Sequence, residues 1–290
     1  MSNKKILILG SRGTLGQALV KEFTNVGFYD VTSWDRDDID VTDEAQLKEK
    51  IGLLRPEIII NTVAHNAVDK IETEEAEFLS AQKINGEAVK NLSLIAKELG
   101  AVLVHYSSDY VFAGVKEEGY AEEDSLEPIN KYGQTKLMGE KYLLENASQF
   151  YLIRLSKLFS DTKAGSTSKK SFVETMLSLY DQGKRDFDLV DDELSSPTYA
   201  PDLAKFTRAL IEDKKPWGIY HGANSGGCTW YELGKAVFEI KKYDVCSVPV
   251  PSVKFPRPTK LPHTSILLNT KMPPQRPWQE ALKEALQYLN

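Results

Sequence analysis

Short apolar runs that alternate with helical patterns fill the first half of the chain and constrain its fold most strongly. The runs are short, rich in β-branched residues and bounded by turn or charged residues, as strands are: residues 6–9, 28–34, 57–60, 102–105 and 151–155. Between them, apolar residues recur at helical spacing: residues 15–23, 44–54, 75–99 and 132–144. Strands separated by helices need right-handed crossovers, so the sequence predicts a parallel sheet covered by helices on both faces.

The second half of the chain is less regular. Residues 161–170 are small and polar and predict a mobile loop. Pro201 favours the first turn of a helix, because proline has no N–H to lose there. Prolines are dense over residues 247–262, which predicts an extended connection, and a last helix is expected over residues 278–289.

The length of 290 residues allows one large α/β domain or a domain with a small lobe. We predict an α/β protein of Rossmann type, with a doubly wound parallel sheet and a smaller C-terminal substrate-binding lobe. Residues 1–155 would mainly form the NAD(P)-binding domain. Residues 156–290 would mainly form the lobe, with some segments returning to the first domain.

Composition and charge exclude several classes of protein. The net charge is −6 with both signs mixed along the chain, which argues against a nucleic-acid partner. Apolar runs stay far below the roughly 18 residues of a membrane span, and the first one is too short for a secretory signal. Cys228 and Cys246 match no metal-ligand spacing and no disulfide framework. We therefore expect a cytoplasmic protein with no metal and no membrane partner.

A glycine-spaced turn follows the first apolar run directly. Gly10, Gly13 and Gly16 stand where a strand would pass into a helix. Glycine suits such a turn because the backbone must approach a pyrophosphate closely and the helix must pack against the strand. The N–H groups at the start of the helix would then face the phosphates. This position predicts a dinucleotide site.

The residues after the second run leave the choice between NADH and NADPH open. Asp35 stands where an acidic residue can accept a hydrogen bond from the adenosine ribose of NAD. Arg36 is adjacent and Arg12 lies in the first turn, and arginine can bind the extra phosphate of NADP. The cofactor is therefore predicted as NADPH or NADH.

Three residues predict a reductase. Tyr132 and Lys136 are four residues apart in a helical pattern, so their side chains can enter one cleft. The ammonium would favour the phenolate and lower the tyrosine pKa, which is ordinarily near 10. Tyr132 would then donate a proton to a carbonyl oxygen, a role worth about 10²–10⁴ in rate. Ser108, at the end of the fourth run, could polarise that carbonyl.

Together these motifs resemble the extended short-chain dehydrogenase/reductases and, within them, the dTDP-4-dehydrorhamnose reductase family. The likeness covers nearly the whole chain and is most specific in the segments 106–112 and 196–198, with further pieces at 61–70, 132–136, 191–195, 218–221 and 257–258. It implies reduction of the 4-keto group of a nucleotide-linked deoxysugar, most simply dTDP-4-dehydro-L-rhamnose. The alternatives are another keto nucleotide sugar, or a non-catalytic regulatory subunit like the beta subunit of methionine adenosyltransferase.

The resemblance also implies roles for individual residues. Ser108 takes the threonine place of the catalytic triad, with Tyr132 as proton donor and Lys136 beside it. The cofactor would meet the glycine turn and the ends of the next strands: Gly13, Thr14 and Leu15 at the pyrophosphate, Asp40 and Val41 at the adenine, and Val63, Ala64, His65 and Tyr106 along the cleft. The sugar would contact Ser108 and Asp109.

One departure from the family pattern concerns the sugar. The family usually carries Arg-Thr-Ser-Trp after the fifth strand, and its tryptophan packs on the sugar, whereas this chain has Lys157 in that place. Lys157 is therefore a candidate substrate contact that could change the preferred sugar. Arg257 is a further candidate, for the substrate diphosphate, although a solvated proline-rich loop explains it equally well. The partner is expected to be a small nucleotide sugar, and a homodimer is left open.

Overall fold

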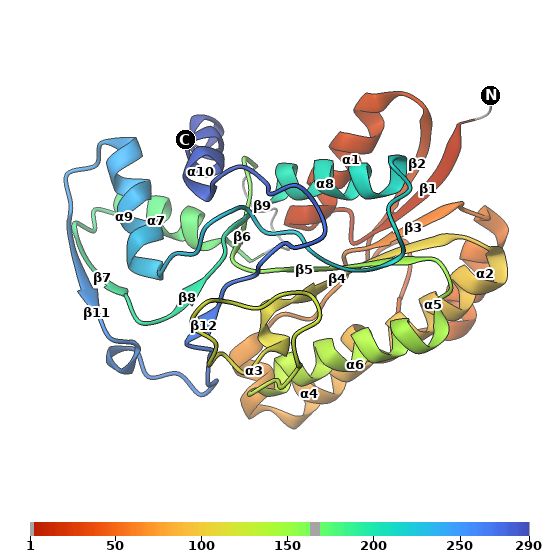
Figure 1. The fold of residues 1–290 in the computed structure, drawn as a ribbon, viewed down its shortest axis with the longest axis horizontal. Helices are drawn as coiled ribbons and strands as arrows, with labels where there is room; N and C mark the ends of the chain where they lie inside the picture. Colours follow the sequence, from red (N-terminus) through yellow and green to blue (C-terminus); the bar gives the residue numbers. More distant parts are fainter. Residues whose placement is uncertain (1–2, 163–168, 290) are drawn as a thin grey trace.

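The computed structural model describes residues 3–162 and 169–289, and it has the α/β fold that the sequence predicts (Figure 1). A six-stranded sheet in the order β10-β5-β4-β3-β1-β2 forms its centre, and every adjacent pair of strands is parallel. The strands of this sheet are β1 (Lys4–Leu9), β2 (Tyr29–Trp34), β3 (Ile58–Asn61), β4 (Val102–Ser108), β5 (Phe150–Leu155) and β10 (Gly218–His221).

Helices connect these strands and also build most of the C-terminal part. The α-helices are α1 (Thr14–Val26), α2 (Glu44–Leu54), α3 (Val68–Thr73), α4 (Glu75–Gln82), α5 (Ala88–Leu99), α6 (Lys131–Asn146), α7 (Phe172–Asp181), α8 (Ala200–Glu212), α9 (Trp230–Lys241) and α10 (Trp278–Tyr288). Shorter turns are the π-helical η1 (Lys83–Glu87) and the 3₁₀ turns η2 (Asp109–Val111) and η3 (Ser252–Lys254).

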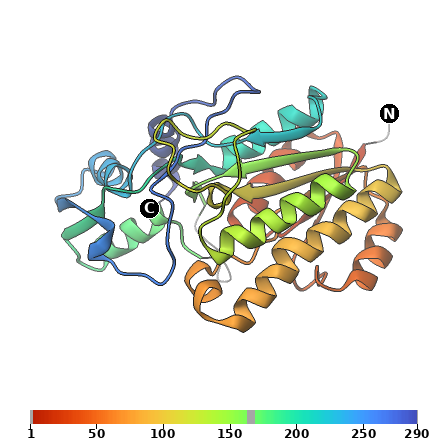
Figure 2. The same cartoon turned by 60° about the horizontal axis from the view of Figure 1, so that its bottom comes forward.

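Alternating side chains of the strands feed two apolar layers. Ile6 and Ile8 of β1 pack toward α1 and α8, whereas Leu7 and Leu9 pack toward α2, α5 and α6. All four side chains are essentially fully buried, as expected for a strand covered on both faces. Figure 2 shows α5 and α6 side by side on one face of the sheet. Apolar packing against the sheet and α5 therefore fixes the position of α6.

A separate apolar core holds the C-terminal lobe. It joins α7, α9 and α10 with short strands, and its fully buried members include Phe159, Val173, Tyr199 and Val237. The strands of this part pair two by two: β11 (Cys246–Val250) with β7 (Asp186–Val190), β12 (Thr264–Ser265) with β8 (Leu194–Ser195), and β6 (Leu158–Phe159) with β9 (Thr198–Tyr199). Two segments of the C-terminal half belong to the first unit instead, because β10 pairs with β5 and α8 packs on α1.

The structure corrects one predicted element. Residues 75–99 do not form one α-helix, because the π-helical turn η1 separates α4 from α5. Hydrophobic periodicity cannot reveal such a turn, which adds one residue to the helical repeat without a break in the chain. The predicted mobile loop at residues 161–170 lies mostly outside the described residues. The segment 247–262 is extended as predicted, apart from the short turn η3. Within the described part of the chain, no helix is long and apolar enough to cross a membrane.

Candidate active site

A cavity of about 870 Å³ lies at the carboxyl ends of the parallel strands, where α/β sheets bind ligands. Segments that directly follow β1, β2, β3 and β5 line it, together with the end of β4 and the first turns of α1 and α6. The opposite wall comes from the C-terminal half and includes Glu193, Trp230 and Ser265. The cavity therefore has one wall of strand ends and one wall from the lobe.

The glycine turn lines one end of the cavity. Gly10 has a φ of 77°, and a Cβ on Gly16 would lie 2.1 Å from the Gly10 carbonyl oxygen, so the turn accepts no side chain there. Helix α1 begins at Thr14, and its N-cap is Gly13, which has no side chain to cap the helix. A phosphate can thus approach the first N–H groups of α1 closely. These residues fit the pyrophosphate of a dinucleotide.

Charges of both signs lie beyond the end of β2, at the adenosine end of the cavity. Asp35 accepts hydrogen bonds from the backbone N–H groups of Arg12, at 2.9 Å, and Arg36, at 2.8 Å. The Arg12 guanidinium forms an ion pair with Asp37, and that of Arg36 lies 4.0 Å from Asp35. Asp35, Arg12 and Arg36 all line the cavity. The arrangement can serve a ribose hydroxyl or a phosphate, so the choice of cofactor stays open.

Asp40 and Val41 lie further along the same wall. The Asp40 carboxylate accepts from the Thr42 hydroxyl at 2.7 Å and from the Thr42 backbone N–H at 2.8 Å. These hydrogen bonds hold the pKa of Asp40 below its ordinary value. Val41 is buried and lines the cavity.

Asn85, a residue that the sequence analysis missed, fixes the segment after β3. Its side-chain oxygen accepts from the His65 N–H at 2.8 Å, and its amide nitrogen donates to the His65 carbonyl at 3.0 Å and to Thr135 Oγ1 of α6 at 2.9 Å. Asn85 is fully buried on the π-helical turn η1. It connects the segment after β3 to the helix of Tyr132, and only the position of the π turn would have pointed to it.

Tyr132 and Lys136 both face the cavity from α6, as their spacing predicts. Helix α6 starts with a sharp N-cap, where the Asn130 side chain accepts from the Gly133 N–H at 2.8 Å. The Lys136 ammonium is buried and donates to the Tyr106 carbonyl oxygen at 2.7 Å. The phenol and the ammonium therefore share one crevice.

The pKa of Tyr132 differs from the sequence-based expectation. Burial raises the pKa of its phenol well above 10, the negative charge of Asp109 adds to this rise, and a hydrogen bond with Ser108 opposes it. Burial lowers the pKa of Lys136 to about 8, against the opposing effect of Glu140. The expected lowering of the Tyr132 pKa by Lys136 is wrong for the net shift, because desolvation of the phenol dominates. The phenol is consequently protonated at neutral pH, as a proton donor must be.

Asp109 organises the hydroxyl groups beside Tyr132. It is 2% exposed and accepts from Ser108 Oγ at 3.0 Å, Ser156 Oγ at 2.7 Å and Ser265 Oγ at 2.6 Å. Burial raises the pKa of Asp109, and these three hydroxyl donors partly offset that rise. The Ser108 oxygen accepts in turn from the Tyr110 N–H at 3.2 Å. Ser156 belongs to the segment that ends at Lys157, whereas Ser265 comes from a distant segment that no sequence motif marked.

Lys157 lies at the lobe end of the cavity with an unusual backbone, at a φ of 41°. Its ammonium donates to the Cys228 carbonyl at 2.8 Å and lies 4.2 Å from the centre of the Trp230 ring. Trp230 in turn donates from Nε1 to Glu193 at 3.0 Å. Burial lowers the pKa of Lys157 to about 8. Trp230 packs on Phe172 and also lines the cavity.

The cavity brings together nearly all predicted site residues. Those that line it are Gly10, Gly13, Thr14, Leu15, Gly16, Asp35, Asp40, Val41, Val63, Ala64, His65, Tyr106, Ser108, Asp109, Tyr132, Lys136 and Lys157. Arg257 is not among the described residues that line it; its guanidinium lies 3.2 Å from Glu193, which does. The individual roles stay predictions. Over the described ranges, no cluster of His, Cys, Asp or Glu could hold a metal ion.

Comparison with known proteins agrees with this geometry. The family model described as RmlD substrate binding domain matches residues 4–290. A dTDP-4-dehydrorhamnose reductase of Escherichia coli is 34% identical, with 98% of this chain and 97% of that protein covered. The spore coat polysaccharide biosynthesis protein SpsK of Bacillus subtilis is 33% identical over the same shares.

A solved structure gives the same result in three dimensions. The dTDP-4-dehydrorhamnose reductase of Bacillus anthracis in complex with NADP superimposes with a TM-score of 0.91 at 31% identity, covering 98% of this chain and 99% of that one. The agreement extends over the whole length of both proteins. The chain therefore belongs to the dTDP-4-dehydrorhamnose reductase family, whose model carries the description RmlD substrate binding domain.

Proposed function

We propose that this enzyme reduces the 4-keto group of a nucleotide-linked deoxysugar with NADPH or NADH, and that dTDP-4-dehydro-L-rhamnose is its substrate. Family membership supports an NAD(P)H-dependent oxidoreductase acting on a nucleotide sugar. The observation that carries the proposal is the meeting of Tyr132, Lys136 and Ser108 in the cavity whose other end is the glycine turn. A proton donor for the carbonyl oxygen and a binding site for the dinucleotide thus line the same cavity.

The chain's own residues would hold the cofactor as follows. The first N–H groups of α1 bind its pyrophosphate, and Lys136, next to the Tyr106 carbonyl, is placed to bind the nicotinamide ribose. When bound, the reduced nicotinamide supplies the hydride for the carbonyl carbon. Arg12 and Arg36 favour a cofactor with a ribose phosphate, whereas Asp35 favours one with a free hydroxyl.

Tyr132 would supply the proton. Its phenol, protonated because of its raised pKa, donates to the carbonyl oxygen of the sugar as the hydride adds to the carbon, so that an alcohol forms. The phenolate left behind gains from the positive charge of Lys136, one turn along the same helix face. Ser108 lies beside the phenol, and its hydrogen bond with Tyr132 favours the phenolate that the reaction leaves.

The test is consumption of NADPH or NADH with enzymatically prepared dTDP-4-dehydro-L-rhamnose. Tyr132→Phe should lower turnover by about 10²–10⁴ while cofactor affinity changes little, because only the proton donor is lost. Tyr142→Phe, on the same helix but outside the cavity lining, is the matched control and should retain activity. Unchanged turnover of Tyr132→Phe, or cofactor binding by the wild type without turnover of any sugar nucleotide, would overturn the proposal.

A second candidate keeps the chemistry and changes the sugar. Lys157 places a cation where the family pattern has tryptophan, and it lines the cavity beside Trp230. A panel of keto nucleotide sugars separates the two candidates. Poor reduction of the rhamnose precursor beside efficient reduction of a relative would favour the second.

A further inference from the structure

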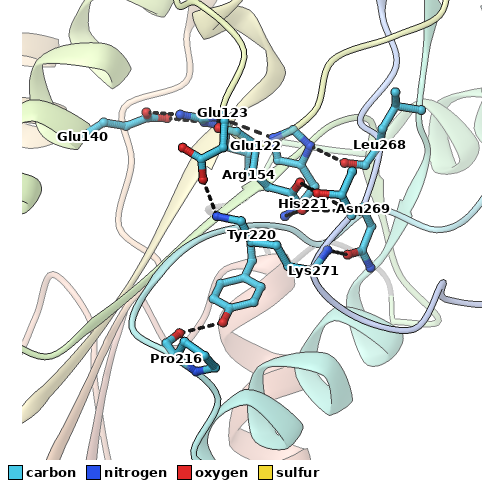
Figure 3. A network of polar contacts seen from close by, with 11 residues as sticks. Glu122, Glu123, Glu140, Arg154, Pro216, Tyr220, His221, Leu268, Asn269 and Lys271 are labelled. Carbon is cyan, nitrogen blue, oxygen red and sulfur yellow. Dashed lines mark hydrogen bonds and ion pairs between the residues drawn. The ribbon is translucent and has the colours of Figure 1, made fainter.

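A fully buried ion pair lies one turn beyond Lys136 on the catalytic helix. Glu140 of α6 is 0% exposed and Arg154 of β5 is 1% exposed. Their contact is bidentate, from Arg154 Nε to Glu140 Oε1 at 2.9 Å and from Arg154 Nη2 to Glu140 Oε2 at 2.7 Å (Figure 3). Such a fork fixes both the distance and the orientation of the two groups.

The remaining Arg154 contacts are also defined. Nη1 donates to the Glu122 carbonyl oxygen at 3.0 Å and lies 3.4 Å from His221 Nε2. His221 Nδ1 lies 3.0 Å from the Leu268 carbonyl oxygen, which can only accept, so Nδ1 carries the proton and Nε2 accepts from Arg154. Burial and the Arg154 charge lower the pKa of His221 to about 3, which keeps the ring neutral. The guanidinium also lies 5.1 Å from the centre of the Phe112 ring.

The network reaches a segment near the end of the chain. The Glu122 carboxylate accepts from Thr270 Oγ1 at 2.6 Å, from the Thr270 N–H at 3.2 Å and from the His221 N–H at 3.3 Å. Figure 3 shows Arg154 between Glu140 on one side and His221 on the other. Arg154 thus connects α6 to β10 and to the segment before α10.

The position of Glu140 relates this network to the active site. Tyr132, Lys136 and Glu140 are spaced by four residues and share one face of α6. The helix sits tightly at two glycines on either side of Lys136: a Cβ on Gly133 would lie 2.2 Å from the Tyr110 carbonyl oxygen, and one on Gly139 would lie 2.1 Å from that of Asn85. At this packing distance, a small rotation of α6 would move the phenol and the ammonium together.

We propose that Glu140 and Arg154 are positioning residues for the reaction: by occupying the Glu140 carboxylate, the buried fork leaves the Lys136 ammonium directed at the cavity. The inference rests on the proposed function. It assigns a role to Arg154, which lies three residues before Lys157 in the same segment.

The effect of the fork on Lys136 follows from charge. Without Arg154, Glu140 would be a buried carboxylate with an ammonium four residues away on the same helix face. Attraction between unit charges is strong in a desolvated interior, so Lys136 would turn from the Tyr106 carbonyl to Glu140. Removal of the Glu140 charge as well would abolish that attraction.

The test compares Arg154→Met with the double variant Arg154→Met/Glu140→Gln, using NADPH oxidation per folded enzyme and NADPH affinity. Arg154→Met should lower kcat roughly tenfold or more, since a displaced Lys136 supports Tyr132 poorly. The double variant should recover kcat to within about threefold of the wild type, because two neutral partners leave no unpaired buried charge. A merely structural pair would lower thermal stability in both variants without this rescue of kcat.

The matched control is the Arg276–Asp202 pair, which is also bidentate, at 2.7 and 2.9 Å, and lies away from the cavity lining. Arg276→Met/Asp202→Asn should leave kcat unchanged. Should Arg154→Met not fold, Arg154→Gln is measured in its place, and a kcat equal to that of the wild type would refute the positioning role. Equal kcat in Arg154→Met and the double variant would refute it too. Failure of the wild type to turn over any sugar nucleotide would instead refute the proposed function.

Discussion

The two ends of the cavity are built in different ways. At the cofactor end, residues contribute mainly through their backbone, in short segments that each follow a strand, as Gly10 to Gly16 follow β1. At the lobe end, side chains from distant parts of the chain meet, as Lys157, Glu193 and Trp230 do. A backbone-built site depends on the local turn, whereas a side-chain-built site depends on how the lobe packs onto the sheet. We therefore expect the cofactor end to keep its binding function when side chains at the lobe end are changed.

The largest effect should come from Gly16→Ala at the cofactor end. A Cβ there would lie 2.1 Å from the Gly10 carbonyl oxygen. The start of α1 would therefore have to move away from the proposed phosphate position. Overpacking of this kind costs about 1–3 kcal/mol, so NADPH affinity should fall roughly tenfold or more in a fluorescence titration. Gly52→Ala, where no described heavy atom lies within 4 Å of the added Cβ, should bind normally. Equal affinities would mean that the turn is not the phosphate site.

The pH dependence separates the two ends, because each carries one ammonium with a pKa of about 8, Lys136 near the cofactor and Lys157 in the lobe. Both are charged below that pH and lose their charge above it. Since Tyr132 stays protonated there, kcat/KM should fall about tenfold per pH unit above 8 as Lys136 deprotonates. The same alkaline limb should persist in Lys157→Met. Its disappearance in that variant would assign the limb to the lobe instead.

A smaller effect is expected at the lobe end from Trp230→Ala. The indole lines the cavity between Lys157 and Glu193, so its loss should raise KM for the sugar nucleotide roughly tenfold with little change in kcat, as the loss of uniform binding does. NADPH affinity should not change if the two ends are independent. Trp217→Ala, outside this cavity, provides the matched control. A parallel loss of NADPH affinity would show that the ends are coupled.

The smallest effect concerns the adenosine end. The Arg36 side chain is 76% exposed, and exposed ion pairs contribute about 0.2–1 kcal/mol. Arg36→Ala should therefore raise KM for NADPH by about two- to fivefold and leave KM for NADH unchanged. Steady-state kinetics with both cofactors decides this. An equal rise for both would exclude a contact with the ribose phosphate.

The same division explains what the sequence could predict. The strand runs, the glycine turn and the pair Tyr132–Lys136 are local patterns, and a spacing of four on a helix places two side chains on one face in any fold. The sheet and its helical layers followed from these patterns. The motif likeness added Asp40 and Val41, which line the cavity; their contact with the adenine stays a prediction.

The remaining features depend on tertiary contacts. Trp230 belongs to no motif, and its place in the sequence does not show that α9 begins beside Lys157. Ser265 reaches Asp109 across 156 positions of sequence, and no local pattern links them. The raised pKa of Tyr132 likewise depends on burial by several segments, which outweighs the lysine that the sequence places nearby.

The wide turn η1 has a consequence for how this protein can vary in length. Because an α-helix advances by 3.6 residues per turn, loss of one residue from Lys83–Glu87 would let the hydrogen-bond ladder run on regularly from α4 into α5. The two flanking helices would keep their facing, because the wide turn holds one residue more than a regular turn, but the residues within it would shift. Asn85 would then lose its position between His65 and Thr135. A one-residue deletion here should therefore be far more damaging than the same deletion in an exposed loop.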